Sequence, residues 1–317
     1  MPLLLRQQDV AGLLDLERAI ELTTAVVLEE AAGTALHMAP FGGSGGPRRI
    51  MRVTGGALYG FGRLGVRAGG LSLLFDIESQ EPLAIMDLPI ADLRLGASVG
   101  LAARYLSRLD ARRVGLLGSG KIALGILQGL CAVRSIEAVD VYSPTVEHRH
   151  AFAERAGEAL GIPVIARDSP GAVAAEADIL AVATNAHTPA VTYEQLRAGT
   201  HVSSAGLNSE LDASVYLGAD QLVAASREQE IDSAMPTKTP GRVTGGVLYD
   251  LLQSGAIRGD SILELGALAR GDVVPRNGPA DINVFRESRG GVGEIAFASW
   301  VYDRAREQDL GVDFDFS

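Results

Sequence analysis

The sequence predicts an α/β fold in which a doubly wound parallel sheet follows an N-terminal α+β region. From Arg112 onward, short apolar segments alternate with helix-like segments, as in parallel sheets covered by helices. A glycine-rich turn at residues 118–123 separates the first apolar segment from its helix. Before Arg112 the chain has short strand-like pieces joined by glycine, which are typical of an antiparallel sheet.

The glycine-rich turn has the pattern G-x-G-x-x-G/A, with Gly118, Gly120 and Ala123 at its three small positions. The first glycine permits a tight turn, the second lets backbone approach a pyrophosphate, and the small third residue lets the helix pack on the strand. A strand at 114–117, a helix at 122–134 and a strand at 138–142 would make one βαβ unit. The pattern therefore predicts a Rossmann-type dinucleotide site, with a plain structural turn as the alternative.

The N-terminal region begins with an expected helix from Asp15 to Ala31, since apolar residues recur at helical spacing and Asp15 can cap it. A flexible loop is expected at Gly42–Pro47 from its composition. A turn at 78–81 and a long helix from Pro89 to Leu109 close this region. Strands are expected at 49–54, 57–60, 65–68, 72–76 and 82–86.

The alternating region continues through further strands and helices after residue 142. Its strands are expected at 164–166, 179–183, 201–204 and 221–224, and its helices at 145–160, 171–175, 193–197 and 210–217. Beyond them, 243–253 and 262–269 look helical and 285–289 is a candidate strand. A final helix at 292–308 is expected to return to the N-terminal region.

Composition restricts the class of protein. The 317 residues carry a net charge of −11, which argues against nucleic-acid binding. No apolar run is long enough for a transmembrane helix, and no signal peptide is evident. The single cysteine, Cys131, excludes an internal disulfide, and His148 and His150 are too poorly spaced on a helix for a metal pair. A cytoplasmic enzyme without a metal, and without membrane or nucleic-acid partners, is expected.

The charge is distributed unevenly. No acid occurs between Ala31 and Phe75, while five arginines do, at positions 48, 49, 52, 63 and 67. Arginine forks match carboxylates and phosphates in a bidentate manner. The segment therefore suggests an anion site, with a solvated loop as the alternative.

Several stretches together resemble the ornithine cyclodeaminase/μ-crystallin family. They are residues 93–94, 102–106, 114–123, 183–185, 210–212, 282–286 and 290–296, in the order of the chain. The resemblance implies a homodimer with a dimerisation and substrate-binding domain at 1–109 plus 281–317. A Rossmann domain at 110–280 would be inserted between these two parts.

The resemblance also implies the substrate site. The family's carboxylate-binding arginine on the helix before the Rossmann domain matches Arg94, and its other arginine matches Arg52, with Arg49 as the fallback. The family's active-site lysine matches Arg67, a poor proton shuttle because a guanidinium is always charged. We expect Arg52, Arg67 and Arg94 to hold a small carboxylate-bearing substrate.

The aspartate of the cyclodeaminases would fall near Asn208, and no acid is present there. An asparagine cannot take a proton at neutral pH, so deamination by that route loses its base. Asp212 is expected to be structural, at a helix start.

The cofactor is expected to be NADP(H), with NAD(H) possible, because Ser143 rather than an acid stands at the end of the second strand. Asp140 lies earlier, inside that strand. The expected cofactor contacts are Gly118, Ser119, Gly120, Lys121, Ile122, Ser143, Thr145, Arg149, Thr184 and Asn185.

The function expected from these features is an NAD(P)H-dependent oxidoreductase that reduces a small imino or ketimine acid or oxidises an amino acid. The alternatives are an NAD-dependent cyclodeaminase-type lyase and an NADP-binding protein without turnover. The proton donor and the substrate's side chain are not identified by any motif.

Overall fold

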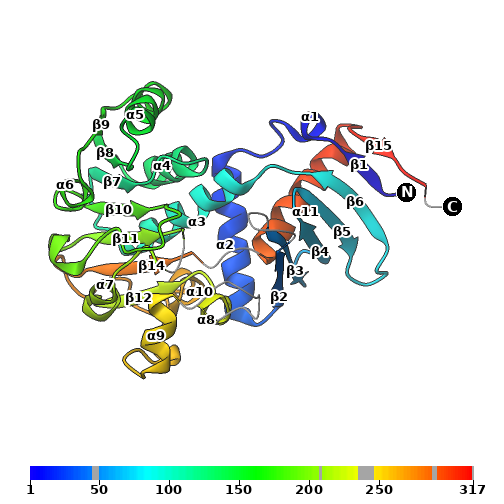
Figure 1. Ribbon diagram of the computed structural model, residues 1–317. Helices are drawn as coiled ribbons and strands as arrows, with labels where there is room; N and C mark the ends of the chain where they lie inside the picture. The colour runs from blue at the N-terminus through cyan, green and yellow to red at the C-terminus, as the bar shows by residue number, and fades with distance from the viewer. Residues whose placement is uncertain (45–49, 207–208, 235–245, 288–290, 316–317) are drawn as a thin grey trace. The chain divides into compact units, whose positions relative to one another are not determined.

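The computed structural model describes residues 1–44, 50–206, 209–234, 246–287 and 291–315, and its strands form two separate sheets (Figure 1). Each sheet belongs to its own compact unit. Among the described residues, the first unit holds 1–94 and 291–315, and the second holds 95–234 and 246–287. The predicted α/β class, with a parallel sheet and a separate mixed sheet, is confirmed.

The first unit contains a seven-stranded sheet in the order β15-β1-β6-β5-β4-β3-β2. Strand β1 runs parallel to β6, and the other neighbours are antiparallel. The strands are β1 (Leu3–Leu5), β2 (Ala35–Ser44), β3 (Ile50–Leu58), β4 (Arg63–Ala68), β5 (Leu71–Asp76), β6 (Pro82–Asp87) and β15 (Val312–Asp313). The helices of this unit are α1 (Gln7–Val10), α2 (Leu16–Ala32) and α11 (Val292–Glu307).

Helix α2 confirms the first predicted helix, because Asp15 caps it by accepting a hydrogen bond from the Arg18 amide at 2.8 Å. Helix α11 confirms the final one and packs against β3, β4 and α2. Its buried face includes Ile295, Phe297 and Val301.

Two predictions for this sheet were wrong. Residues 42–44 are not a loop but the end of β2, paired antiparallel with residues 50–52; residues 45–47 of the same prediction lie outside the described residues. The two strands predicted at 49–54 and 57–60 are one strand, β3, because Gly55 and Gly56 keep their ladder partners on β4 instead of forming a turn. Strands β1, β2 and β15 were not predicted.

The second unit contains an eight-stranded parallel sheet in the order β13-β12-β14-β11-β10-β7-β8-β9. Its strands are β7 (Arg113–Leu117), β8 (Ala138–Tyr142), β9 (Val164–Ala166), β10 (Ile179–Val182), β11 (His201–Ser204), β12 (Gln221–Ala224), β13 (Leu263–Glu264) and β14 (Asn283–Arg286). The first six match the predicted strands to within one residue.

The helices of this unit follow the predicted alternation. They are α4 (Ala123–Val133), α5 (Val146–Leu160), α6 (Pro170–Ala174), α7 (Ala213–Gly218), α8 (Arg227–Ala234), α9 (Val247–Gln253) and α10 (Leu265–Arg270), with short 3₁₀ turns η1 (Tyr193–Gln195) and η2 (Gly259–Ser261). Asp212 caps α7 by accepting from the Ser214 amide at 2.9 Å, which confirms its structural role. The helix predicted at 262–269 was partly wrong, since β13 occupies residues 263–264 before α10 begins.

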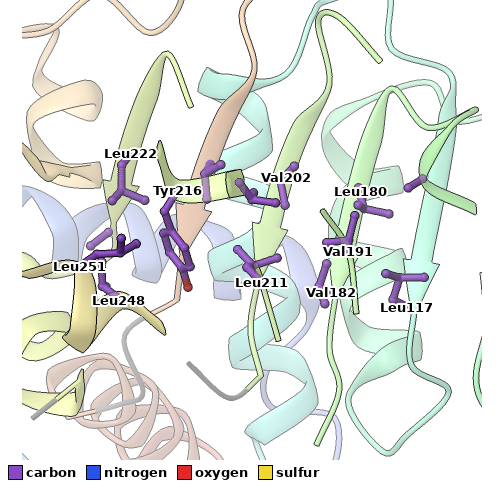
Figure 2. Packing of buried hydrophobic residues seen from close by; sticks show 14 of the residues in the cluster. Leu117, Leu180, Val182, Val191, Val202, Leu211, Tyr216, Leu222, Leu248 and Leu251 are labelled. Atoms are coloured by element: carbon purple, nitrogen blue, oxygen red, sulfur yellow. The ribbon is translucent and has the colours of Figure 1, made fainter. Parts of the chain in front are cut away.

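One apolar cluster holds helices onto a face of this sheet. Leu117, Leu180 and Val202 come from three adjacent strands and belong to the same cluster as Tyr216 of α7 and Leu248 of α9 (Figure 2). These strands are buried on both sides, so β7 and β10 are almost wholly apolar in sequence, whereas β11 carries a buried histidine and two buried serines. Truncating such a buried leucine to alanine costs about 2–5 kcal/mol.

The two units divide within α3 (Ala91–Leu106), between Arg94 and Leu95. The predicted boundaries at 109 and 281 differ from this division. The larger part of α3 packs tightly on α4, because a Cβ on Gly96 would lie only 2.2 Å from the Gly125 carbonyl oxygen. Strand β14, which follows residue 281, lies between β11 and β12. The roles assigned to the two domains stay predictions.

In the part of the chain that the structure describes, no helix is both long and apolar enough to cross a membrane.

Candidate functional site

The turn between β7 and α4 has the geometry that the glycine pattern predicts. Gly118 adopts φ +111°, and a Cβ there would lie 2.4 Å from the Ala183 carbonyl oxygen and 3.6 Å from Cγ2 of Thr184. Its amide donates to the Tyr142 carbonyl oxygen at 2.8 Å. Only glycine therefore fits this corner, which joins the ends of β7, β8 and β10.

The rest of the turn is open. Gly120 is exposed, with no atom within 4 Å of its Cβ position, and Lys121 is exposed beside it. Helix α4 begins after its N-cap Ile122, whose side chain makes no capping hydrogen bond. A helix N-terminus with accessible backbone favours an anion through its amides and its dipole. The corner thus fits a dinucleotide diphosphate.

The end of β8 carries the residues expected to face the adenosine ribose. The Ser143 hydroxyl lies 2.9 Å from the Ser119 hydroxyl, and Thr145 is exposed at the N-cap of α5. The Arg149 guanidinium is buried, where it donates to the Ser143 carbonyl oxygen at 3.3 Å and to Asp168 at 2.7 Å. Arg149 therefore braces the turn that follows β8.

Asp140 does not lie at this corner. Its buried carboxylate accepts from Arg113 at 3.1 Å and from Arg167 at 2.7 Å. The first residue after β8, where the sequence analysis looks for a ribose-binding acid, is Ser143.

A buried carboxylate that the sequence analysis did not select, Glu210, joins the ends of β10 and β11. One oxygen, Oε2, accepts from the Thr184 amide at 2.9 Å and from its hydroxyl at 3.0 Å. The other, Oε1, accepts from the Ser204 hydroxyl at 2.6 Å and the Gly206 amide at 2.7 Å. Thr184 is thereby fixed beside Gly118, while its neighbour Asn185 is exposed.

Glu210 belongs to a fully buried charge cluster. Arg286 of β14 lies 3.7 Å from Glu210 and donates from Nε to Glu230 of α8 at 2.9 Å. Burial raises the pKa of Glu210, although Arg286 opposes the change. Burial alone would lower the pKa of Arg286, but Glu230, Tyr216 and Glu210 raise it overall. Because both Glu210 oxygens accept hydrogen bonds, the ionised carboxylate fits its surroundings best.

The first unit holds a second polar cluster, which contains two of the three predicted substrate arginines. Arg67 of β4 lies 3.8 Å from Glu294 of α11, and Arg94 of α3 lies 3.9 Å from the same carboxylate oxygen. Arg67 also donates to the Leu88 carbonyl oxygen at 2.9 Å, and Thr54 donates to the other Glu294 oxygen at 2.7 Å.

The three charged side chains are only 14–16% exposed. They are thus largely shielded from water but still reachable. A pocket runs along this cluster, lined by Thr54, Arg67, Ser72 and Glu294 among apolar neighbours.

Some predicted positions could not be placed in this cluster. The backbone of Arg52 lies in β3, opposite Gly42, but its side chain is outside the described part of the structure. Arg49 and Asn208 lie outside the described residues altogether. The sequence analysis did not select Glu294 as a candidate site residue. Its sequence signal is an acid in the first turn of a last helix that begins directly after two glycines.

Comparison with known proteins gives a consistent result. The model of the ornithine cyclodeaminase/mu-crystallin family matches residues 66–309. A Delta(1)-pyrroline-2-carboxylate reductase of Bacillus cereus is 32% identical over 252 residues, which cover 78% of this chain and 74% of that protein. The iminosuccinate reductase of Paracoccus denitrificans is 25% identical over 344 residues, covering 99% of each.

Solved structures agree with the sequence relatives. The structure of Thermococcus litoralis Delta(1)-pyrroline-2-carboxylate reductase in complex with NADH and L-proline has a TM-score of 0.87 and 26% identity to this chain. The match covers 98% of this chain and all of that one.

Proposed function

Because the chain belongs to the ornithine cyclodeaminase/mu-crystallin family, we propose that it reduces a small cyclic or acyclic 2-imino carboxylate to the corresponding amino acid. The predicted family and enzyme class, an NAD(P)-dependent oxidoreductase of the imine reductase and amino-acid dehydrogenase type, are confirmed by its relatives. The substrate, the direction and the residues that carry the reaction are the proposal.

The observation that carries the proposal is the placement of Arg67 and Arg94 around one pocket-lining carboxylate. Two guanidiniums that are mostly removed from water bind a carboxylate strongly, because charge-assisted hydrogen bonds gain strength where the dielectric is low. Arg52 is proposed as a third contact from its place in β3. Holding the carboxylate fixes the adjacent α-carbon, and orientation of that carbon is one of the main contributions a protein makes to hydride transfer.

For the cofactor, we propose that the backbone of Gly118 to Ile122 holds the diphosphate at the start of α4. Thr184 and Asn185 would lie near the nicotinamide end of the site, since the carboxyl ends of β7 and β10 meet there. When bound, the reduced nicotinamide supplies a hydride to the imine carbon, and the C=N electron pair moves to nitrogen. The role of Glu210 is to hold Thr184 in position.

We further propose that the cofactor is NADP(H). The support is that Ser143 and Thr145 provide hydroxyls where an NAD-selective site has an acid, and that Arg149 lies beneath the same turn. The bound Asp140 does not supply the missing acid, because two arginines already hold it. NAD(H), which the Thermococcus relative binds, is the competing choice.

A homodimer is proposed from the family resemblance, and its mass in solution by light scattering tests this directly.

A nucleotide-binding protein without turnover remains the second candidate, favoured by Arg67 in place of the lysine implied by the resemblance. The oxidation of reduced cofactor in the presence of an imino acid separates the reductase from the binding protein.

The test of the proposed site is Arg94→Met with Arg104→Met as the matched control, since Arg104 is exposed on the same helix. Losing two charge-assisted contacts to the carboxylate is expected to lower kcat/KM for Δ1-pyrroline-2-carboxylate by about 100-fold or more. The Kd for reduced cofactor should not change. Unchanged kinetics in Arg94→Met would refute the assignment, and an inactive wild-type protein that binds cofactor would favour the second candidate.

A further inference from the structure

A row of polar side chains crosses three neighbouring strands beneath α11. Thr54 on β3 is paired with Arg67 on β4, and Arg67 is paired with Ser72 on β5. Residues that are cross-strand partners point to the same face of a sheet. All three line the pocket in which Glu294 of α11 also lies.

Among the residues that the structure describes, hydrogen bonds hold the Glu294 carboxylate at one oxygen. Its Oε2 accepts from the Thr54 hydroxyl at 2.7 Å. Its Oε1 is 3.8 Å from Nε of Arg67 and 3.9 Å from Nε of Arg94, which is attraction without a direct hydrogen bond. Oε1 therefore lies between the two arginines without accepting a hydrogen bond from either of them.

Ser72 provides an independent indication that a ligand binds here. Its side chain is 4% exposed, and its Oγ has no hydrogen-bond partner among the described residues. An unsatisfied buried hydroxyl costs free energy. A ligand with a hydrogen-bonding group in this pocket would remove that cost.

We propose that this pocket, together with Arg94 beside its Glu294, recognises a zwitterion, in which Glu294 binds the cationic nitrogen of the substrate while Arg67 and Arg94 bind its carboxylate. This inference rests on the proposed function and adds to it a residue that contacts the reacting group. In an α-imino or α-amino acid, the nitrogen and the carboxylate are attached to the same carbon. The site has a matching arrangement of opposite charge, because Oε1 of Glu294 lies about 4 Å from the guanidinium of Arg67 and from that of Arg94.

The arrangement also has a consequence for reactivity. A carbon–nitrogen double bond accepts hydride more readily when the nitrogen carries a proton and a positive charge. By accepting a hydrogen bond from the protonated nitrogen, Glu294 would hold that proton in place as hydride approaches the carbon. Ser72, which flanks Arg67 on the side away from Thr54, would donate a hydrogen bond from its hydroxyl to the substrate carboxylate.

A structural explanation also exists, because an acid in the first turn stabilises a helix such as α11. The test must therefore separate ligand charge from helix stability. Two probes do so: L-proline, whose ring nitrogen is cationic, and tetrahydrofuran-2-carboxylate, which has the same ring with an uncharged oxygen. Both are titrated calorimetrically into the full-length protein saturated with reduced cofactor, with which neither probe can react.

The wild-type protein is expected to bind L-proline at least about 10-fold more tightly than the oxygen analogue, the value of one hydrogen bond to a charged group. In Glu294→Gln the two affinities should become equal within about 3-fold. Glu307→Gln, which changes an exposed acid on the same helix, should keep the wild-type preference.

If Glu294→Gln retains the wild-type preference, this proposal is overturned while the proposed function stands. A wild-type protein that binds cofactor but neither probe overturns both. Should Glu294→Gln not fold, Thr54→Val decides, since it removes the hydroxyl that positions Glu294; a reduced preference supports the proposal and an unchanged one contradicts it.

Discussion

The most informative perturbation of the second unit is Glu210→Gln, because this buried carboxylate accepts from four donors. Two of them, the Thr184 and Ser204 hydroxyls, can rotate to suit an amide. The other two, the amides of Thr184 and Gly206, cannot. A glutamine has one oxygen and one NH₂, so one of these backbone amides must lose its acceptor whichever way the side chain turns.

The cost follows from these contacts. A buried amide left without an acceptor costs about 1–3 kcal/mol. Arg286 also loses a charged neighbour at 3.7 Å, although Glu230 remains and a neutral amide is cheaper to bury than a carboxylate. The net expected loss is about 2–4 kcal/mol in the free energy of unfolding, or roughly 5–10 °C in Tm.

Thermal and urea unfolding of the wild-type protein and Glu210→Gln measure this loss, with Glu158→Gln on the exposed face of α5 as the control. Because Thr184 lies against Gly118, the Kd for reduced cofactor should also rise several-fold. A variant with wild-type Tm and wild-type cofactor affinity would refute the role assigned to Glu210.

Three further outcomes are expected. Gly118→Ala places a Cβ 2.4 Å from the Ala183 oxygen at φ +111°, so calorimetry should show both lost cofactor affinity and a lower Tm; normal binding would contradict the tight corner. Ser143→Asp should shift the ratio of kcat/KM values toward NADH by about 10-fold or more, because an acid there repels a 2′-phosphate; an unchanged ratio would exclude Ser143 from cofactor choice. Burial lowers the pKa of His201 to about 3. Below about pH 6.5 the unfolded chain therefore binds a proton at this residue that the folded protein does not bind. Its stability should therefore fall as the pH drops from about 6.5 to 3, and less steeply in His201→Gln; equal slopes in urea unfolding would contradict this.

The parallel sheet was predictable because its strands are short, buried on both faces and separated by helices. Residues 114–117 read as a strand from their apolar run, and 138–142 read as one from the apolar residues on either side of Asp140. Strand β2 was missed because its last residues are Gly42, Gly43 and Ser44, whose composition indicates a loop, while their pairing partners lie on another strand. The short strands β1 and β15 depend on pairing between opposite ends of the chain, which no local pattern reports.

A local motif or a family resemblance selected some residues of the proposed site from sequence alone. Gly118 was identified by its pattern, and Arg67 and Arg94 by resemblance. Glu294 and Glu210 were not, because their importance comes from contacts with residues far away in sequence, such as Thr54 with Glu294. For both acids, the residues that they contact in the fold, and not the residues next to them in the chain, indicate the proposed role.

The central claim is tested most directly by mixing the wild-type protein with NADPH, or separately NADH, and Δ1-pyrroline-2-carboxylate. The absorbance of the reduced nicotinamide is followed and the amino-acid product is identified by chiral chromatography. We expect stoichiometric loss of reduced cofactor and formation of proline, faster with NADPH. Bound cofactor with no oxidation, for this imine or for imines formed from 2-keto acids and amines, would contradict it.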